Sequence, residues 1–148
     1  MRTEKNIVFL VGIAVLIGMG AFAHAAPPVK SCSDEDQYAF YQDLLEKDQM
    51  LRSSAALPNV EFRDKLLKQD TENQTQLDKI VEACGWPEDS PFSNSKLEAA
   101  YLVVQHSSKE FAERYRSRVE AAYAKGLIPQ QQMDNFRRYV DLKNRWGK

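Results

Sequence analysis

Apolar residues recur along the chain at the three- and four-residue steps of helix faces, and no stretch alternates as a β-strand does. The first such pattern covers residues 33–54 and opens with Ser33 before three acids, which suits a helix N-terminus. Its predicted inward line contains Tyr41, Leu45, Asp48 and Arg52, with Leu44 and Leu51 beside it. Two charged residues therefore lie on a stripe that a helix would normally bury.

A second helix is expected over residues 60–83, followed by Gly85 as its stop and Pro87 as a breaker. Its inward stripe contains Leu66, Asp70, Asn73, Leu77, Ile80 and Cys84. Here again polar residues, Asp70 and Asn73, interrupt an otherwise apolar line. The short connection with Pro58 predicts that the two helices pack as an antiparallel hairpin.

The segment from Leu97 to Val104 is apolar on nearly every side, which predicts a short helix at the centre of the core. Ser95-x-x-Glu98 supplies a capping box at its start, and Gln105 and His106 close it. The spacing Ser107-x-x-Glu110 predicts a second capping box immediately afterwards.

Two more helices complete the pattern. One is expected over residues 108–125 and ends at Gly126, and the other over residues 129–145 with Pro129 at its start. Their predicted inward residues are Phe111, Tyr115, Val119 and Ala122 in the first, and Met133, Phe136, Val140 and Trp146 in the second. The sequence thus predicts an all-α fold, a compact bundle of about five helices.

The two cysteines, Cys32 and Cys84, fall at the two ends that an antiparallel hairpin brings together. We therefore expect a disulfide that staples this hairpin, provided that the chain enters an oxidising compartment. The alternative is a pair of buried free thiols.

The N-terminus supports export. A weakly positive start, an apolar run from Ile7 to Phe22 and the small-x-small sequence Ala23-His24-Ala25 form the pattern of a secretory signal peptide. We expect residues 1–25 to be removed by a cut after Ala25, residues 26–32 to be a leader, and residues 33–148 to form one helical domain. The mature protein would then be periplasmic or secreted, without a membrane anchor. The competing interpretation is a retained anchor, for which about 25 Å of helix is short.

The polar residues of the hairpin form the first candidate site. In an antiparallel pair, Asp48 and Arg52 of one helix face the region of Asp70 and Asn73 of the other. Buried charges are normally paired, so these four side chains fit an internal salt-bridge network that fixes helix register. The functional alternative is a polar pocket that binds a small ligand or a partner's side chain.

Four motifs carry a resemblance. Asp48-Gln49-x-x-Arg52, Asp70-x-x-Asn73, Gly85-Trp86-Pro87 and the segment 102–106, Leu-Val-Val-Gln-His, occur in this order over residues 45–111. In these motifs the chain resembles a bacterial domain-of-unknown-function family. The resemblance implies a helical domain and brings no established activity.

His106 is the only histidine after the predicted cleavage site and can act as acid, base or ligand near neutral pH. With Asp48, Asp70 or Gln105 beside it, His106 could position a substrate or a water; otherwise it caps a helix and binds an aspartate. Only three ligands could converge on a metal, so we expect neither a metal nor an organic cofactor. Trp86 is expected to pack over the disulfide, or alternatively to anchor a protein interface.

A net charge of −1 gives no electrostatic reason to expect nucleic acid or an acidic membrane surface as a partner. The sequence contains neither His-Glu-x-x-His nor a glycine-rich phosphate loop. Export, small size and the lack of an evident catalytic constellation favour a protein-binding domain. The most concrete hypothesis is an immunity or inhibitor protein that neutralises a toxic effector in the envelope. The alternatives are a small hydrolase using His106 with Asp48 or Asp70, and a structural envelope protein.

Overall fold

The computed structural model describes residues 31–53 and 60–146, with side chains up to residue 142. These residues form five α-helices and no β-strand, which confirms the predicted all-α class. The helices are α1 (Asp34–Ser53), α2 (Val60–Cys84), α3 (Lys96–His106), α4 (Lys109–Ala124) and α5 (Gln130–Trp146). The predicted signal peptide and leader up to residue 30, and the side chain of Trp146, lie outside the described part.

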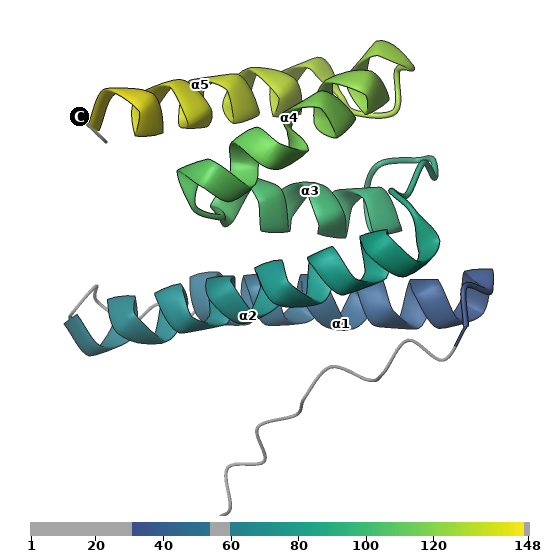
Figure 1. Cartoon of the computed structure of the whole chain (residues 1–148), viewed down its shortest axis with the longest axis horizontal. Helices are drawn as coiled ribbons and strands as arrows, with labels where there is room; N and C mark the ends of the chain where they lie inside the picture. The colour runs from purple at the N-terminus through teal and green to yellow at the C-terminus, as the bar shows by residue number, and fades with distance from the viewer. Residues whose placement is uncertain (1–30, 54–59, 147–148) are drawn as a thin grey trace, which may run out of the picture.

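Helices α1 and α2 form the predicted antiparallel hairpin, and α3 lies against both (Figure 1). Helices α4 and α5 follow on the other side of α3. The end of α1, the start of α2, the end of α3 and the end of α5 all lie at one end of the molecule (Figure 1). We call this the hairpin-turn end, and it carries the candidate site described below.

The predicted disulfide between Cys32 and Cys84 is present, with the two Cα atoms 5.4 Å apart. It joins Cys32, two residues before α1, to the last residue of α2, as the hairpin geometry requires. The same end is held by the Ser33 hydroxyl, which accepts a hydrogen bond from the backbone N–H of Asp36 at 3.3 Å.

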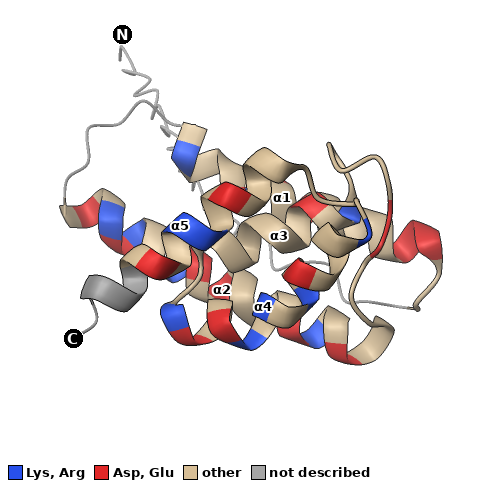
Figure 2. Cartoon of the chain, turned by 90° about the horizontal axis from the view of Figure 1, so that it is seen from above, with Lys and Arg blue, Asp and Glu red and all other residues tan. Residues whose placement is uncertain are grey.

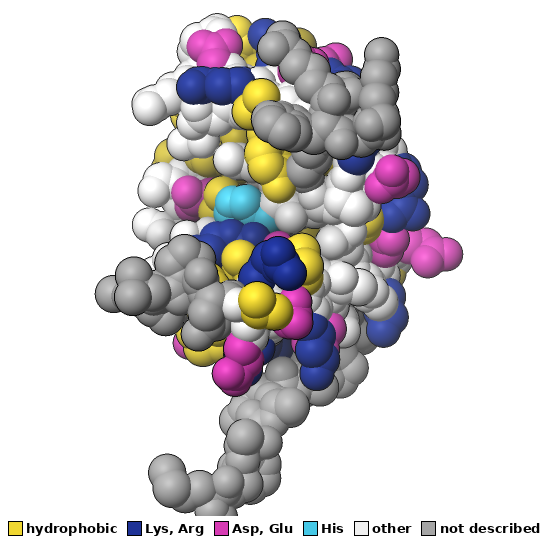
Figure 3. Space-filling view, turned by 90° about the vertical axis from the view of Figure 1, so that its left-hand side faces the viewer, with side chains coloured by type: hydrophobic (Ala, Val, Ile, Leu, Met, Phe, Trp, Pro, Cys, Tyr) yellow, Lys and Arg dark blue, Asp and Glu magenta, His cyan; other side chains and the backbone are white. Residues whose placement is uncertain are grey.

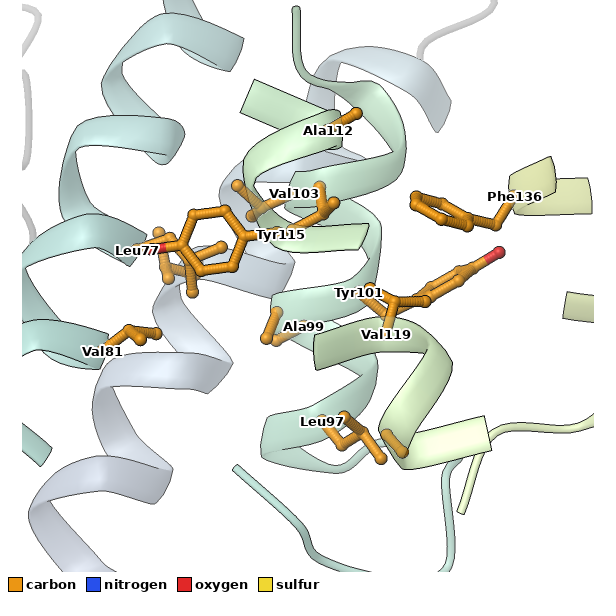
Figure 4. Packing of buried hydrophobic residues seen from close by; sticks show 14 of the residues in the cluster. Leu77, Val81, Leu97, Ala99, Tyr101, Val103, Ala112, Tyr115, Val119 and Phe136 are labelled. Carbon is orange, nitrogen blue, oxygen red and sulfur yellow. The ribbon is translucent and has the colours of Figure 1, made fainter. Parts of the chain in front are cut away.

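Helix α3 is the centre of the core, as its composition predicted. Leu97, Tyr101 and Val104 are fully buried, and their helix packs against α1 and α2 on one side and α4 and α5 on the other. Figure 4 shows Leu77 and Tyr115 on one side of α3 and Phe136 beyond Tyr101 on the other. The buried residues of the later helices agree with the predicted stripes: Phe111, Tyr115, Val119, Ala122, Met133, Phe136 and Val140.

The boundaries of α3 and α4 are set by side-chain and backbone caps. Ser95 caps α3, and the carboxylate of Asp89, which no sequence motif indicated, accepts hydrogen bonds from the N–H groups of Lys96 and Leu97 at 2.9 Å each. The second predicted capping box is wrong in its register. Ser108 caps α4 by accepting from the N–H of Phe111, whereas Ser107 terminates α3.

The end of α4 follows the sequence rule closely. Gly126 has φ +73°, and its N–H donates to the carbonyl of Tyr123 while the next N–H, of Leu127, donates to Ala122. This is the Schellman pattern, which favours glycine because a left-handed residue with a Cβ is strained. The chain then turns through Pro129, whose carbonyl accepts hydrogen bonds from the N–H groups of Gln132 and Met133 in the first turn of α5.

None of the described helices combines the length and the apolarity that a membrane-spanning segment needs. Acidic and basic residues are interspersed over the helices rather than gathered by sign (Figure 2).

Candidate functional site

The candidate site is organised around a side-chain hydrogen bond between α1 and α3. Nδ1 of His106 lies 2.9 and 3.0 Å from the two carboxylate oxygens of Asp48. His106 is the last residue of α3, and Asp48 lies on the inward line of α1. Asp48, a polar residue on this buried stripe, therefore has a hydrogen-bonding partner on another helix.

Arg52 links the two acids of the hairpin. One guanidinium nitrogen lies 3.3 Å from the Asp48 carboxylate and donates to the Asp48 backbone carbonyl at 2.9 Å. The other donates to the Asp70 carboxylate on α2 at 2.7 Å. Arg52 therefore joins α1 to α2, and His106 adds α3 to the same network.

The four residues differ in their access to solvent. The side chain of Asp48 is 1% exposed and that of Asp70 is 10% exposed, whereas His106 and Arg52 are each 20% exposed. The acids are thus buried, and the bases form the outer part of the cluster. Histidine, basic and hydrophobic surface lie next to one another on the face that contains this end of the molecule (Figure 3).

The pKa of the Asp70 carboxyl reflects how burial and charge act within the cluster. Burial is the main cause that raises the pKa of its carboxyl above the ordinary value, and the Arg52 guanidinium opposes this increase without cancelling it. Desolvation of this acid therefore outweighs its ion pair.

Helix α5 contributes a residue that the sequence motifs did not identify. Burial raises the pKa of the Tyr139 hydroxyl, the Asp70 charge raises it further, and the Arg52 charge lowers it. These influences place Tyr139 within electrostatic range of the cluster. Its position on the inward side of α5 was readable from helical spacing, but its neighbours come from helices far away in the sequence.

Amide side chains satisfy several remaining groups of the cluster. Gln49, next to Asp48 in the sequence, donates to the Asp48 carboxylate at 2.6 Å. The carbonyl oxygen of the Asn73 side chain accepts from Gln69 at 2.9 Å, while its buried Nδ2 has no partner among the described residues. Asn73 therefore lies on the predicted buried face, but among the described residues it does not hydrogen-bond to the charged side chains.

The two other predicted site residues are Trp86 and Gln105. Trp86 is partly buried against the core, and its ring centroid lies 5.5 Å from that of Tyr115. This packing favours the structural interpretation of Trp86 over an exposed anchor. The Oε1 atom of Gln105 is buried and has no hydrogen-bond partner within the described part of the chain.

The described residues bring no three histidine, cysteine or acidic side chains together in a way that could hold a metal ion. What the cluster provides instead is an aspartate-oriented imidazole beside a guanidinium. The Asp48 carboxylate accepts a hydrogen bond from Nδ1 of His106 and thereby fixes the orientation of the imidazole ring.

Comparisons with protein-family models, curated proteins and solved structures give no match for this chain.

Proposed function

We propose that the mature chain is an exported domain that binds another protein. The observation that carries this proposal is that the two acids at the candidate site are already bonded to side chains of the same chain. Asp48 is held by His106, Arg52 and Gln49, and Asp70 by Arg52. A carboxylate that acts on a substrate must reach it, and these two are buried beneath their own partners.

The disulfide supports the proposed export to an oxidising compartment. Disulfides persist in secreted and periplasmic proteins and are rare in the reducing cytosol. A disulfide between Cys32 and Cys84 is compatible with the export that the N-terminal pattern predicts. Our most concrete version is an immunity or inhibitor protein that neutralises an antibacterial effector in the envelope.

The test is a pull-down from the envelope fraction with tagged residues 26–148, read by mass spectrometry. Wild type and His106→Ala are used side by side, after circular dichroism has shown that both are folded. We expect one stoichiometric partner, retained by both forms if the histidine is structural. The proposal fails if neither form retains a partner and if deletion of the gene leaves cells no more sensitive to sister cells.

A second candidate is a small hydrolase that uses His106 as a base. The observation that favours it is the bond from Nδ1 to Asp48, because enzymes orient basic imidazoles in this way. Complementation of a deletion strain separates the two functions. If folded His106→Ala keeps its partner but loses the cellular phenotype, catalysis is favoured; if it restores the phenotype, the hydrolase is excluded.

A further inference from the structure

The two halves of the disulfide differ in their access to solvent. Cys32 is exposed, whereas Cys84 is half-buried and packs against the core. A thiol reduces a disulfide by attacking one of its two sulfur atoms, and access to that atom is one of the factors that control the rate. The exposure of Cys32 therefore favours attack on its sulfur while the protein is folded.

Contacts other than the disulfide hold the start of α1 in place. The side-chain amide of Gln37 donates to the backbone carbonyl of Cys32 at 2.8 Å. One turn further on, the side-chain amide of Gln42 donates to the carbonyl of Asn94 at 3.0 Å, and Tyr41 is fully buried. The start of α1 is thus attached to the rest of the fold independently of the S–S bond.

The end of α2 is also held without the disulfide. The N–H of Gly85 donates to the carbonyl of Val81 at 2.9 Å, and the ring of Trp86 packs against that of Tyr115. Helices α1 and α2 contact each other, and both contact α3. After reduction the two cysteines therefore stay on elements that remain packed together, so the bond can form again.

The disulfide acts mainly on the unfolded chain. It closes a loop between residues that are 52 positions apart, and such a crosslink stabilises a protein largely by lowering the entropy of the unfolded state. Its loss makes unfolding more favourable without removing a packing contact from the folded protein. Reduction can therefore change resistance to unfolding while the helices stay as they are.

We infer that the Cys32–Cys84 disulfide is a redox switch, which a dithiol reduces in the folded protein by attack on the exposed Cys32. The reduced chain keeps its helices and unfolds more easily. The inference goes beyond the proposed protein binding and does not depend on it.

The exchange takes place in two steps. A thiolate of the dithiol forms a bond to Sγ of Cys32, the S–S bond breaks, and Sγ of Cys84 leaves as a thiolate that takes a proton from water. The second thiolate of the dithiol then attacks its own partner sulfur in the mixed disulfide, and Sγ of Cys32 leaves and is protonated. The dithiol loses two electrons and two protons and becomes a disulfide, and the protein gains two of each.

The first test measures how fast dithiothreitol reduces residues 26–148 at mildly alkaline pH without denaturant, with free thiols trapped by iodoacetamide and counted by mass spectrometry. The matched control is Val119→Ala. Val119 is fully buried in α4, a helix that the disulfide does not join. Its truncation should raise the equilibrium constant for unfolding about tenfold, which urea denaturation verifies.

If the folded protein is attacked directly, the two reduction rates should agree within about twofold, because Cys32 is equally exposed in both variants. A rate that rises for Val119→Ala in proportion to its unfolding constant shows that reduction requires unfolding, and overturns the inference. If Val119→Ala does not fold, Tyr101→Phe takes its place, with an unfolding constant expected to rise about fivefold.

Two further measurements test the site of attack and the outcome. Brief treatment with 2-mercaptoethanol, an acid quench and peptide mass spectrometry should find the mixed disulfide on Cys32, and an adduct mainly on Cys84 contradicts the assignment. Protein kept reduced in dithiothreitol should retain the helical circular dichroism spectrum and unfold at a lower urea concentration than the oxidised form. Loss of the helical spectrum on reduction, or an unchanged urea midpoint, excludes the switch.

Discussion

Nδ1 of His106 and the carboxylate of Asp48, 58 positions apart in the sequence, lie 2.9 Å from each other. This contact connects the last residue of the central helix α3 to the buried stripe of α1. Through Arg52 the same carboxylate is linked to Asp70 of α2. A single buried acid thereby joins three helices.

We expect Asp48→Ala to lower the free energy of unfolding by about 3 kcal/mol, because the partly buried side chains of His106, Arg52 and Gln49 lose their common acceptor. Urea denaturation followed by circular dichroism measures this change. Glu46→Ala is the control, since Glu46 lies on the exposed side of the same helix, and it should change stability by less than about 0.5 kcal/mol. Equal losses in the two variants would contradict the structural role of Asp48.

The disulfide should contribute more to the free energy of unfolding than any surface contact. Replacing both cysteines by serine, Cys32→Ser with Cys84→Ser, opens a crosslink with a sequence separation of 52 residues. The chain-entropy model then predicts a loss of up to about 4 kcal/mol. The helical circular dichroism spectrum should persist in the absence of denaturant, because α1 and α2 also pack against α3. A reducing agent should destabilise wild type and leave the double variant unchanged; no effect on wild type would argue against the bond.

Two fully buried tyrosines should respond differently to the same substitution. The hydroxyl of Tyr101 donates to the carbonyl of Gln132 at 2.7 Å, whereas the hydroxyl of Tyr41 has no partner among the described residues. We expect Tyr101→Phe to cost about 1 kcal/mol and Tyr41→Phe to be neutral or to stabilise by up to about 1 kcal/mol. Thermal denaturation of both variants against wild type gives the comparison, and a larger loss for Tyr41→Phe would contradict it.

The raised pKa of Asp70 predicts how its contribution to stability depends on pH. The unfolded chain has the ordinary aspartate pKa of 3.8, so between that pH and the raised value the folded state binds more protons. Stability contributed by this group should therefore increase as pH falls from neutral through the raised pKa, and level off below 3.8.

Unfolding profiles of wild type and Asp70→Asn between pH 7 and pH 3 isolate this effect, because asparagine does not titrate. Wild type should gain stability relative to the variant on acidification. If it loses stability instead, the ion pair with Arg52 outweighs burial, and the direction assigned to the Asp70 pKa is wrong.

Some predictions succeeded because they depend on short stretches of chain. Gly126 ends α4 and Pro129 opens α5 through local backbone rules. The capping residue of α4 was harder to predict from the sequence, since Ser107 and Ser108 both offer a hydroxyl at nearly the same place. The choice of Ser108 depends on where α3 ends, and Ser107 is used there as the C-terminal cap.

The sequence by itself determined the helical class, the hairpin, the disulfide and the acids on buried stripes, since these follow from periodicity and from the ends of two antiparallel helices. Only the tertiary structure decided which groups meet. It paired His106 with Asp48, placed Tyr139 near Asp70, and left Asn73 bonded to Gln69 instead. The physical reason is that helical spacing fixes the face on which a residue lies, whereas the partner across an interface depends on how several helices pack together.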